Sequence, residues 1–329
     1  MWLAATVAVG LLALPWVIAL ALAPHHHLDV ALVGILAAVS IPLSGLWLAW
    51  VTVAKGGGSG APATGLSAAQ VADQIAVAVG KQWADEAAIR RLNDPYPLPG
   101  SWDAADTSLA DSWDSIVKLA SSGAGWPAPP PAGTWAPGPD DLAGSGGELV
   151  EVLARVPTGR LVVLGEPGAG KTMLMVRLVL DLLARRAAGG PVPFLTSIAS
   201  WNPAEQDLRD WLGDQLLIDH PALAGPPADR AEPTHAAALL ASGLILPVLD
   251  GLDEIPEEAR GPAIGRINDA LRPGEQAVVT SRIRQYRDAV RPQEGIEVTL
   301  RAAAAIELRP LDVAVVAPAG RRRSPRLSM

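Results

Sequence analysis

The hydrophobic pattern divides the chain into two parts. Residues 2–23 and 30–54 are apolar runs of 22 and 25 residues, joined by the polar connection 24–29. A helix of 22 residues, at about 1.5 Å per residue, is about 33 Å long, close to the roughly 30 Å of a bilayer's hydrocarbon core. The pattern therefore predicts a transmembrane hairpin over residues 1–54.

A cleaved signal peptide and a buried pair of core helices are the alternatives for these two runs. Residues 21–23 resemble a small-residue cleavage site, but the basic segment that begins a signal peptide is missing. No lysine or arginine precedes Lys55, so the orientation rests on that residue and the amino terminus, which favour the cytoplasm. The expected localisation is a multi-pass membrane protein with two spans and a cytoplasmic soluble part.

The remainder of the chain alternates helical and strand-like patterns. Ser67 and Gln70 form a capping box before apolar residues that repeat at helical spacing up to about residue 92. Between residues 122 and 147, 13 of 26 residues are glycine or proline, which predicts a linker because this composition buries little apolar surface. Beyond it, short apolar runs alternate with helical segments. This order is typical of an α/β fold with a parallel sheet and flanking helices.

Composition and charge exclude several functions. The 329 residues include no cysteine, which rules out disulfide scaffolds, thiolate metal sites and cysteine nucleophiles. The formal net charge of −8 disfavours a general nucleic-acid-binding surface. Residues 313–329 carry four arginines among glycine, proline and serine, which predicts a disordered, solvated basic tail. We therefore expect no specific nucleic-acid partner.

One segment matches a phosphate-binding loop. It follows the apolar run 161–164, precedes the helical run 173–186 and fits the pattern G-x-x-x-x-G-K-[ST]. In such a loop, backbone N–H groups bind phosphate oxygens, Lys171 would reach the β- and γ-phosphates, and Thr172 would ligate Mg²⁺. The predicted cofactors are therefore ATP or ADP with Mg²⁺. The predicted nucleotide-binding residues are Gly165, Glu166, Pro167, Gly168, Ala169, Gly170, Lys171 and Thr172.

A second candidate segment lies at the end of a later apolar run. Residues 244–249 lead into Asp250, which would hold Mg²⁺, usually through water, opposite the threonine of the loop. Asp253 and Glu254 follow, where a carboxylate can orient or deprotonate the attacking water. Pro247 is unusual in a central strand because it removes a hydrogen-bond donor, and we expect a bulge there. An ordinary acidic loop is the alternative.

The third candidate is Arg282, which follows the apolar run 276–281. A planar guanidinium suits a phosphate group, so we expect Arg282 to sense the γ-phosphate, with a surface salt bridge as the alternative. Thr280 or Ser281 could hydrogen-bond the phosphate or the water. The predicted catalytic residues are Asp253, Glu254 and Arg282, and the predicted metal ligands are Thr172 and Asp250.

Together these segments resemble the NACHT group of STAND P-loop NTPases, which are related to AAA+ ATPases. The resemblance rests on GEPGAGKT at 165–172, DGLDE at 250–254 and TSR at 280–282, and residues 82–99 resemble a region found before the NTPase in actinobacterial members. It implies a switch in which an ADP form is closed, ATP permits oligomerisation that drives an effector, and slow hydrolysis resets the protein. Bacterial relatives often act in signalling and defence. The implied partners are nucleotide, the lipid bilayer, further copies of the chain and an unknown signalling partner.

The resulting domain division has six parts. They are a transmembrane hairpin (1–54), a flexible linker (55–66), a helical pre-NTPase region (67–121), a Gly/Pro-rich linker (122–147), a NACHT-like P-loop NTPase domain (148–312) and the basic tail (313–329). Similar members continue into a winged-helix domain and a repeat sensor, whereas 47 residues follow Arg282 here, so we expect a C-terminally truncated member or a gene remnant. The alternatives to a switch are an AAA+-like remodelling ATPase and a non-hydrolysing, membrane-tethered scaffold.

Overall fold

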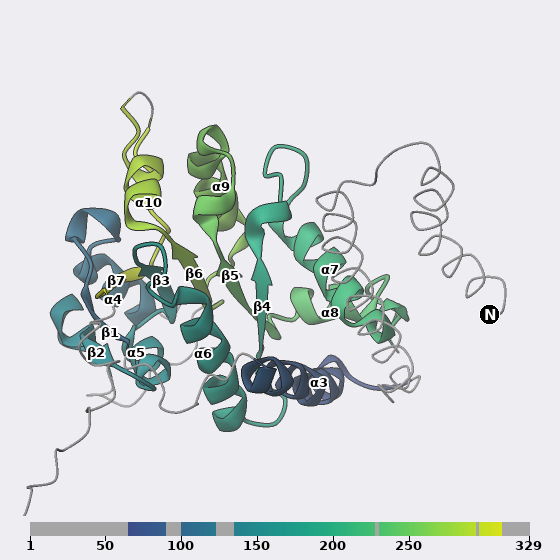
Figure 1. The fold of residues 1–329 in the computed structure, drawn as a ribbon. Helices are drawn as coiled ribbons and strands as arrows, with labels where there is room; N and C mark the ends of the chain where they lie inside the picture. Colours follow the sequence, from purple (N-terminus) through teal and green to yellow (C-terminus); the bar gives the residue numbers. More distant parts are fainter. Residues whose placement is uncertain (1–64, 90–99, 123–134, 228–229, 294–295, 311–329) are drawn as a thin grey trace, which may run out of the picture. The chain divides into compact units, whose positions relative to one another are not determined.

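The computed structural model describes residues 65–89, 100–122, 135–227, 230–293 and 296–310 (Figure 1). All of them belong to a compact unit that comprises Ala61–Met329. The predicted transmembrane hairpin, nearly all of the linker 55–66 and the basic tail lie outside the described residues.

The structure corrects the predicted membrane localisation. Within the ranges that it describes, none of the helices is both long enough and apolar enough to cross a bilayer. Helix α3 (Ala68–Ile89) has 22 residues, but it carries charged side chains at Asp73, Lys81 and Asp85, which are costly to place in hydrocarbon. The two predicted spans, 2–23 and 30–54, lie outside the described residues.

The fold is built on a seven-stranded sheet with the order β2-β1-β7-β3-β6-β5-β4. Strands β3, β4, β5, β6 and β7 run parallel to one another, whereas β1 is antiparallel to both of its neighbours, β2 and β7. The predicted α/β class with a mostly parallel sheet is therefore confirmed. The strands are β1 (Ser101–Ala104), β2 (Gly144–Ser145), β3 (Arg160–Leu164), β4 (Val192–Ser197), β5 (Ile245–Asp250), β6 (Ala277–Ser281) and β7 (Ala304–Leu308).

Helices cover the sheet and bury its central strands. All residues of β3 and β6 are buried, as expected for parallel strands that are covered on both faces. The chain moves along the sheet in one direction from β3 to β4, and in the opposite direction from β4 through β5 and β6 to β7. Because such connections are right-handed, α6 lies on one face of the sheet and α9 and α10 lie on the other. Besides α3, the helices are α4 (Trp113–Ser121), α5 (Leu149–Arg155), α6 (Lys171–Arg185), α7 (Leu208–Asp219), α8 (His235–Ala241), α9 (Glu257–Ala270) and α10 (Ile283–Val290).

Pro247 fits into β5 without the expected bulge. The register between β4 and β5 is continuous from Val192 opposite Ile245 to Ser197 opposite Asp250. The pairing between β5 and β6 is formed at Val248 and Leu249, after the proline. Pro247 thus lies opposite Phe194 within the β4–β5 register and just before the residues that pair with β6.

Two short strands lie where the sequence predicts helices or a linker. Strand β1 lies within the predicted helical region 67–121 and pairs with β7, with Trp102 opposite Leu308. The buried indole of Trp102 donates a hydrogen bond of 3.0 Å to the carbonyl oxygen of Leu142. Strand β2, at Gly144–Ser145, lies within the predicted linker 122–147 and pairs with β1. Both segments therefore extend the sheet on the β7 side.

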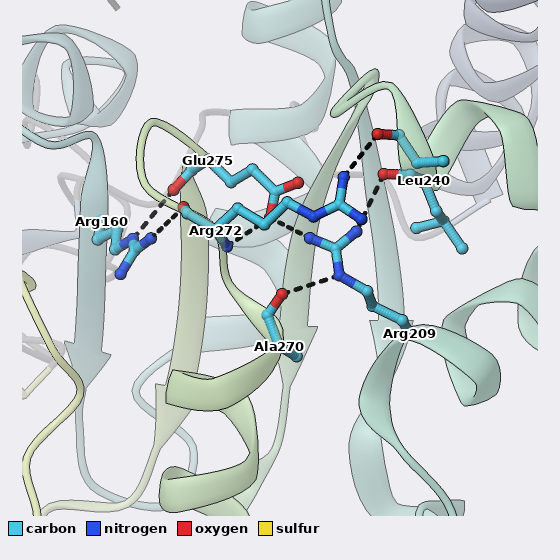
Figure 2. A network of polar contacts seen from close by, with 7 residues as sticks. Arg160, Arg209, Leu240, Ala270, Arg272 and Glu275 are labelled. Atoms are coloured by element: carbon cyan, nitrogen blue, oxygen red, sulfur yellow. Dashed lines mark hydrogen bonds and ion pairs between the residues drawn. The ribbon is translucent and has the colours of Figure 1, made fainter. Parts of the chain in front are cut away.

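Arg160 anchors the amino ends of the parallel strands (Figure 2). Its guanidinium donates to the carbonyl oxygens of Glu275 at 3.0 Å, Arg272 at 2.7 Å and Arg301 at 3.1 Å. The residue is 2% exposed, and this burial lowers the pKa of its guanidinium to about 10, which leaves the group charged at neutral pH. Arg160 thus ties β3 to the segment before β6 and to the segment before β7.

Arg209 of α7 approaches the same segment from the other side (Figure 2). It forms an ion pair with the Glu275 carboxylate, and its guanidinium also donates to the carbonyl oxygens of Ala270 at 2.9 Å and Leu240 at 3.0 Å. Ala270 and Leu240 lie in the last turns of α9 and α8, where backbone carbonyl groups have no partner within the helix. The two arginines therefore fix the end of the sheet that is opposite to the candidate site.

Candidate functional site

The predicted phosphate-binding loop connects the carboxyl end of β3 to the start of α6. Gly170 is the N-cap of α6 and has a φ of +85°, in the left-handed region that favours glycine. It has no side chain to cap the 15-residue helix, and no side-chain cap hydrogen bond is formed at this position. A helix start of this kind favours a bound anion. The local geometry fits the predicted role of residues 165–172.

Lys171 lies across the loop. Its ammonium donates a hydrogen bond of 2.8 Å to the carbonyl oxygen of Gly165 and one of 3.3 Å to that of Glu166. Burial lowers the pKa of Lys171, and the nearby carboxylate of Asp253 opposes this shift. The loop and its lysine thus enclose a position that a phosphate group could take by replacing the two carbonyls.

Thr172 and Asp250 are brought into direct contact. The Thr172 hydroxyl donates a hydrogen bond of 2.7 Å to Oδ2 of Asp250. The other carboxylate oxygen of Asp250 accepts a hydrogen bond from Thr280 of β6, whose hydroxyl in turn accepts one of 2.9 Å from the N–H of Gly251. Both oxygens of the carboxylate are therefore held by hydroxyl groups, one from α6 and one from β6.

The oxygen atoms of Thr172 and Asp250 are suitable ligands for Mg²⁺. A hydroxyl and a carboxylate supply the oxygen ligands that Mg²⁺ prefers, and this ion usually completes its shell with water and substrate phosphates. Among the described residues, no group of three or more histidine, cysteine or acidic side chains is placed to hold a metal ion by itself. A nucleotide-dependent Mg²⁺ site needs no such group.

Asp253 and Arg282 form an ion pair at the next strand end. Nε of Arg282 lies 2.8 Å from Oδ2 of Asp253, and the backbone N–H of Arg282 donates to Oδ1 at 3.0 Å. The Asp253 side chain is 7% exposed and that of Arg282 is 45% exposed. Asp253 is thus engaged through both oxygens, while much of the guanidinium faces solvent.

Glu254 has a different setting from its neighbour. It is exposed, and Oε2 accepts a long hydrogen bond of 3.4 Å from the hydroxyl of Ser197, at the end of β4. Gly251 starts this turn with a φ of +85°, and a Cβ at that position would lie 2.9 Å from Cδ of Glu254. The glycine therefore permits the close turn that places Glu254 beside β4.

The structure brings together the residues of the three predicted segments at one edge of the sheet. Sequence reasoning placed Thr280 or Ser281 on the phosphate or the water, whereas Thr280 contacts Asp250. The hydroxyl of Ser281 is buried and has no hydrogen-bond partner in the part of the chain that the structure describes. Ser197 was missed, although its position as a polar residue at the end of an apolar strand was the available signal.

The comparison with protein families supports a nucleotide site at this edge. Residues 159–316 match the family model of the NACHT domain, a P-loop NTPase family. In a search of curated proteins, none matches the chain. The predicted resemblance to the NACHT group is thereby confirmed for residues 159–316, and it supports a nucleotide-binding NTPase of the STAND type.

Proposed function

We propose, from the NACHT domain at residues 159–316, that this protein is an ATP-dependent signalling switch that hydrolyses ATP slowly. The observation that carries the proposal is the 2.7 Å hydrogen bond between Thr172 and Asp250, which joins the phosphate-binding loop to the acidic strand end. The proposal includes oligomerisation in the ATP form, an unidentified signalling partner and a use in defence.

The proposed nucleotide lies with its phosphates over residues 165–172. The N–H groups at the start of α6 would bind phosphate oxygens. Lys171 exchanges the neutral carbonyl oxygens of Gly165 and Glu166 for anionic oxygens of the β- and γ-phosphates, which are stronger acceptors for an ammonium group. A bound phosphate would therefore take the place of the two carbonyl oxygens beside Lys171.

Thr172 and Asp250 are the proposed Mg²⁺ residues. The Thr172 hydroxyl would bind the ion directly, and the Asp250 carboxylate would do so through water. When bound, Mg²⁺ supplies charge neutralisation and orientation of the phosphates. Thr280 keeps the Asp250 carboxylate in position because its hydroxyl binds the oxygen that Thr172 does not contact.

Glu254 is the proposed base for the attacking water. Its carboxylate is exposed and weakly hydrogen-bonded, so it can accept a proton from a water beside the γ-phosphate. Asp253 acts as a positioning residue, because both of its oxygens hold Arg282. Arg282 would turn from Asp253 towards the γ-phosphate, so the ion pair would distinguish the ATP form from the ADP form.

The exposure of these groups supports slow turnover. Electrostatic stabilisation of a transition state is weaker where water screens the charges. Glu254 is exposed, and the Arg282 side chain is 45% exposed. A slow reaction suits a timer, whereas a remodelling ATPase needs steady turnover.

The test uses the purified full chain. Bound nucleotide is identified after denaturation, and Mg²⁺-dependent ATP turnover is compared between the wild type, Lys171→Ala and the control Lys118→Ala, which changes an exposed lysine on α4. We expect bound ADP and slow turnover that only Lys171→Ala abolishes. Fast turnover would support the remodelling ATPase instead. A folded protein without nucleotide or turnover would contradict the proposal and support the scaffold.

A further inference from the structure

A pocket of about 360 Å³ opens beside the carboxyl end of β4, away from the phosphate-binding loop. It lies between α3, which contributes Gln82 and Trp83, and α7, which contributes Gln215 and Asp219, and Ser197 forms part of its wall. Its volume is within the range of about 300–1,000 Å³ that is common for small-ligand sites. The nucleotide mechanism uses none of the helical residues that line it.

The polar groups of this pocket favour a positively charged ligand. In the part of the chain that the structure describes, no hydrogen bond or ion pair engages the carboxylate of Asp219, and no lysine or arginine lines the pocket. Asp219 ends α7, and the carbonyl end of a helix carries a partial negative charge. Asp219 is exposed overall, so a ligand can reach it, and partial desolvation raises the pKa of its carboxyl, an effect that a nearby cation would oppose.

Trp83 gives the pocket an apolar, aromatic wall. Its ring is half-buried against the core and also lines the pocket. The face of an indole ring attracts cations and packs against apolar or planar groups. Gln82 and Gln215 add amide groups that can accept hydrogen bonds from N–H donors. The lining thus combines one anionic group, neutral acceptors and one aromatic surface.

We propose that this pocket binds a small organic cation, with its ammonium or guanidinium group at Asp219 and its apolar part against Trp83. A simple metal ion fits less well, because the pocket offers one carboxylate and far more space than an ion needs. Binding of the cation does not depend on the nucleotide chemistry.

The pocket is connected to the nucleotide site through one residue. Ser197 lines the pocket, and its hydroxyl donates the 3.4 Å hydrogen bond to Glu254. A ligand ammonium that donates a hydrogen bond to the Ser197 oxygen would turn this hydroxyl and so change the position of the Glu254 carboxylate. The cation is therefore a regulator of hydrolysis, a part of the inference that rests on the proposed function of Glu254.

Binding is tested with benzylamine and its neutral analogue benzyl alcohol, by calorimetry on the nucleotide-free full chain. We expect saturable binding of benzylamine, and binding about tenfold weaker for benzyl alcohol, because a charge-assisted hydrogen bond is lost. Asp219→Asn should weaken benzylamine binding by about tenfold as well. The control Asp210→Asn removes an exposed carboxylate from the same helix, outside the pocket, and should leave binding unchanged.

Three outcomes would overturn the site. They are the absence of saturable benzylamine binding, equal binding of benzyl alcohol, and equal loss of binding in Asp219→Asn and Asp210→Asn. Thermal melting of each variant shows whether it is folded. These measurements involve no nucleotide, so their failure leaves the proposed NTPase function untouched.

The connection to hydrolysis is tested separately with Ser197→Ala. Benzylamine should change the rate of Mg²⁺-dependent ATP hydrolysis in the wild type and have no effect in Ser197→Ala, although both should bind it. An equal effect of benzylamine in both proteins would overturn the role of Ser197. If the wild type binds benzylamine but has no turnover at all, the proposed function fails and the binding site stands.

Discussion

The two ends of the parallel strands carry the same kinds of side chain in opposite settings. At the amino ends, Arg160 is 2% exposed and donates to three backbone carbonyls. At the carboxyl ends, the Arg282 side chain is 45% exposed and pairs with a side chain, Asp253. The partners of Arg160 are backbone carbonyl groups. The partner of Arg282 is an acidic side chain, which the proposed function has it exchange for a phosphate.

We infer from this difference that the amino ends of the strands serve stability and that the carboxyl ends serve the proposed function. A buried charge that loses its partners is strongly destabilising, so the contacts of Arg160 are fixed once the protein is folded. At the other end, the guanidinium of Arg282 is 45% exposed, so its ion pair is expected to contribute less to stability. In the proposed function, a phosphate takes the place of the Asp253 carboxylate beside this guanidinium. On the proposed function, the carboxyl edge changes its contacts while the amino edge holds the strands in register.

The largest expected effect concerns the two neighbouring carboxylates at the carboxyl edge. Glu254→Gln should lower ATP turnover by about 10³-fold, because the proposed base is lost, while ATP binding is retained. Asp253→Asn, its matched partner, should lower turnover by only about tenfold, because it disturbs the position of Arg282 without removing the base. Single-turnover hydrolysis and equilibrium ATP binding measure the two effects. A larger loss of turnover in Asp253→Asn would reverse the two roles.

The next effect compares the two arginines directly. Arg160→Met should lower the free energy of unfolding by about 3 kcal/mol, because it removes charged hydrogen bonds and leaves buried carbonyls unpaired. Arg282→Met should lower it by less, about 1 kcal/mol, since the lost guanidinium is 45% exposed and Asp253 keeps its hydrogen bond from the backbone N–H of residue 282. Denaturant unfolding of both variants gives these values. Equal destabilisation by the two substitutions would contradict the division between a fixed edge and an exchangeable one.

A smaller effect is expected from His220, which follows α7. Burial lowers the pKa of His220 from 6.5 to about 4, and its Nε2 is buried without a hydrogen-bond partner in the described residues. The unfolded chain therefore takes up a proton below about pH 6.5 that the folded protein excludes, so stability is lost as the pH falls towards 4. The loss should be about 1.4 kcal/mol at about pH 5.5.

Unfolding of the wild type and His220→Phe at several pH values tests this prediction. The phenylalanine cannot be protonated and would lie near the ring of Phe194, whose centroid is 6.5 Å from that of His220. The difference in stability between the two proteins should be constant above about pH 7 and should move in favour of the variant below it. A pH-independent difference would show that His220 does not titrate in this range.

The proximity of the candidate residues was predictable because they lie in short contiguous segments. The loop 165–172 and the acidic strand end 250–254 each contain their functional groups within a few residues, and parallel strands bring their carboxyl ends to one edge. The contact between Thr172 and Asp250 follows from these two facts. The hydrogen bond from Ser197 to Glu254 did not, because it depends on β4 lying next to β5.

The anchoring network and the outer strands were not predictable, because they depend on distant segments. Arg160 binds carbonyl oxygens that are 112 to 141 residues away along the chain. Every residue has a backbone carbonyl, so the sequence does not show which ones an arginine will contact. Strand β1 has four residues, too few for a clear alternation, and it is defined by pairing with β7 at the other end of the described chain. The length, local pattern and charge of a segment do not specify which distant segment it will contact.

The most direct test of the central claim is the effect of Mg²⁺ on ATP binding in Thr172→Val. This substitution keeps the shape of the side chain and removes the hydroxyl that contacts Asp250. Calorimetry with ATP, with and without Mg²⁺, should show that Mg²⁺ strengthens binding by about tenfold or more in the wild type and in the control Thr107→Val, which changes an exposed threonine. Thr172→Val should lose this gain. An unchanged gain in Thr172→Val would contradict a Mg²⁺–nucleotide site at the carboxyl edge of the sheet.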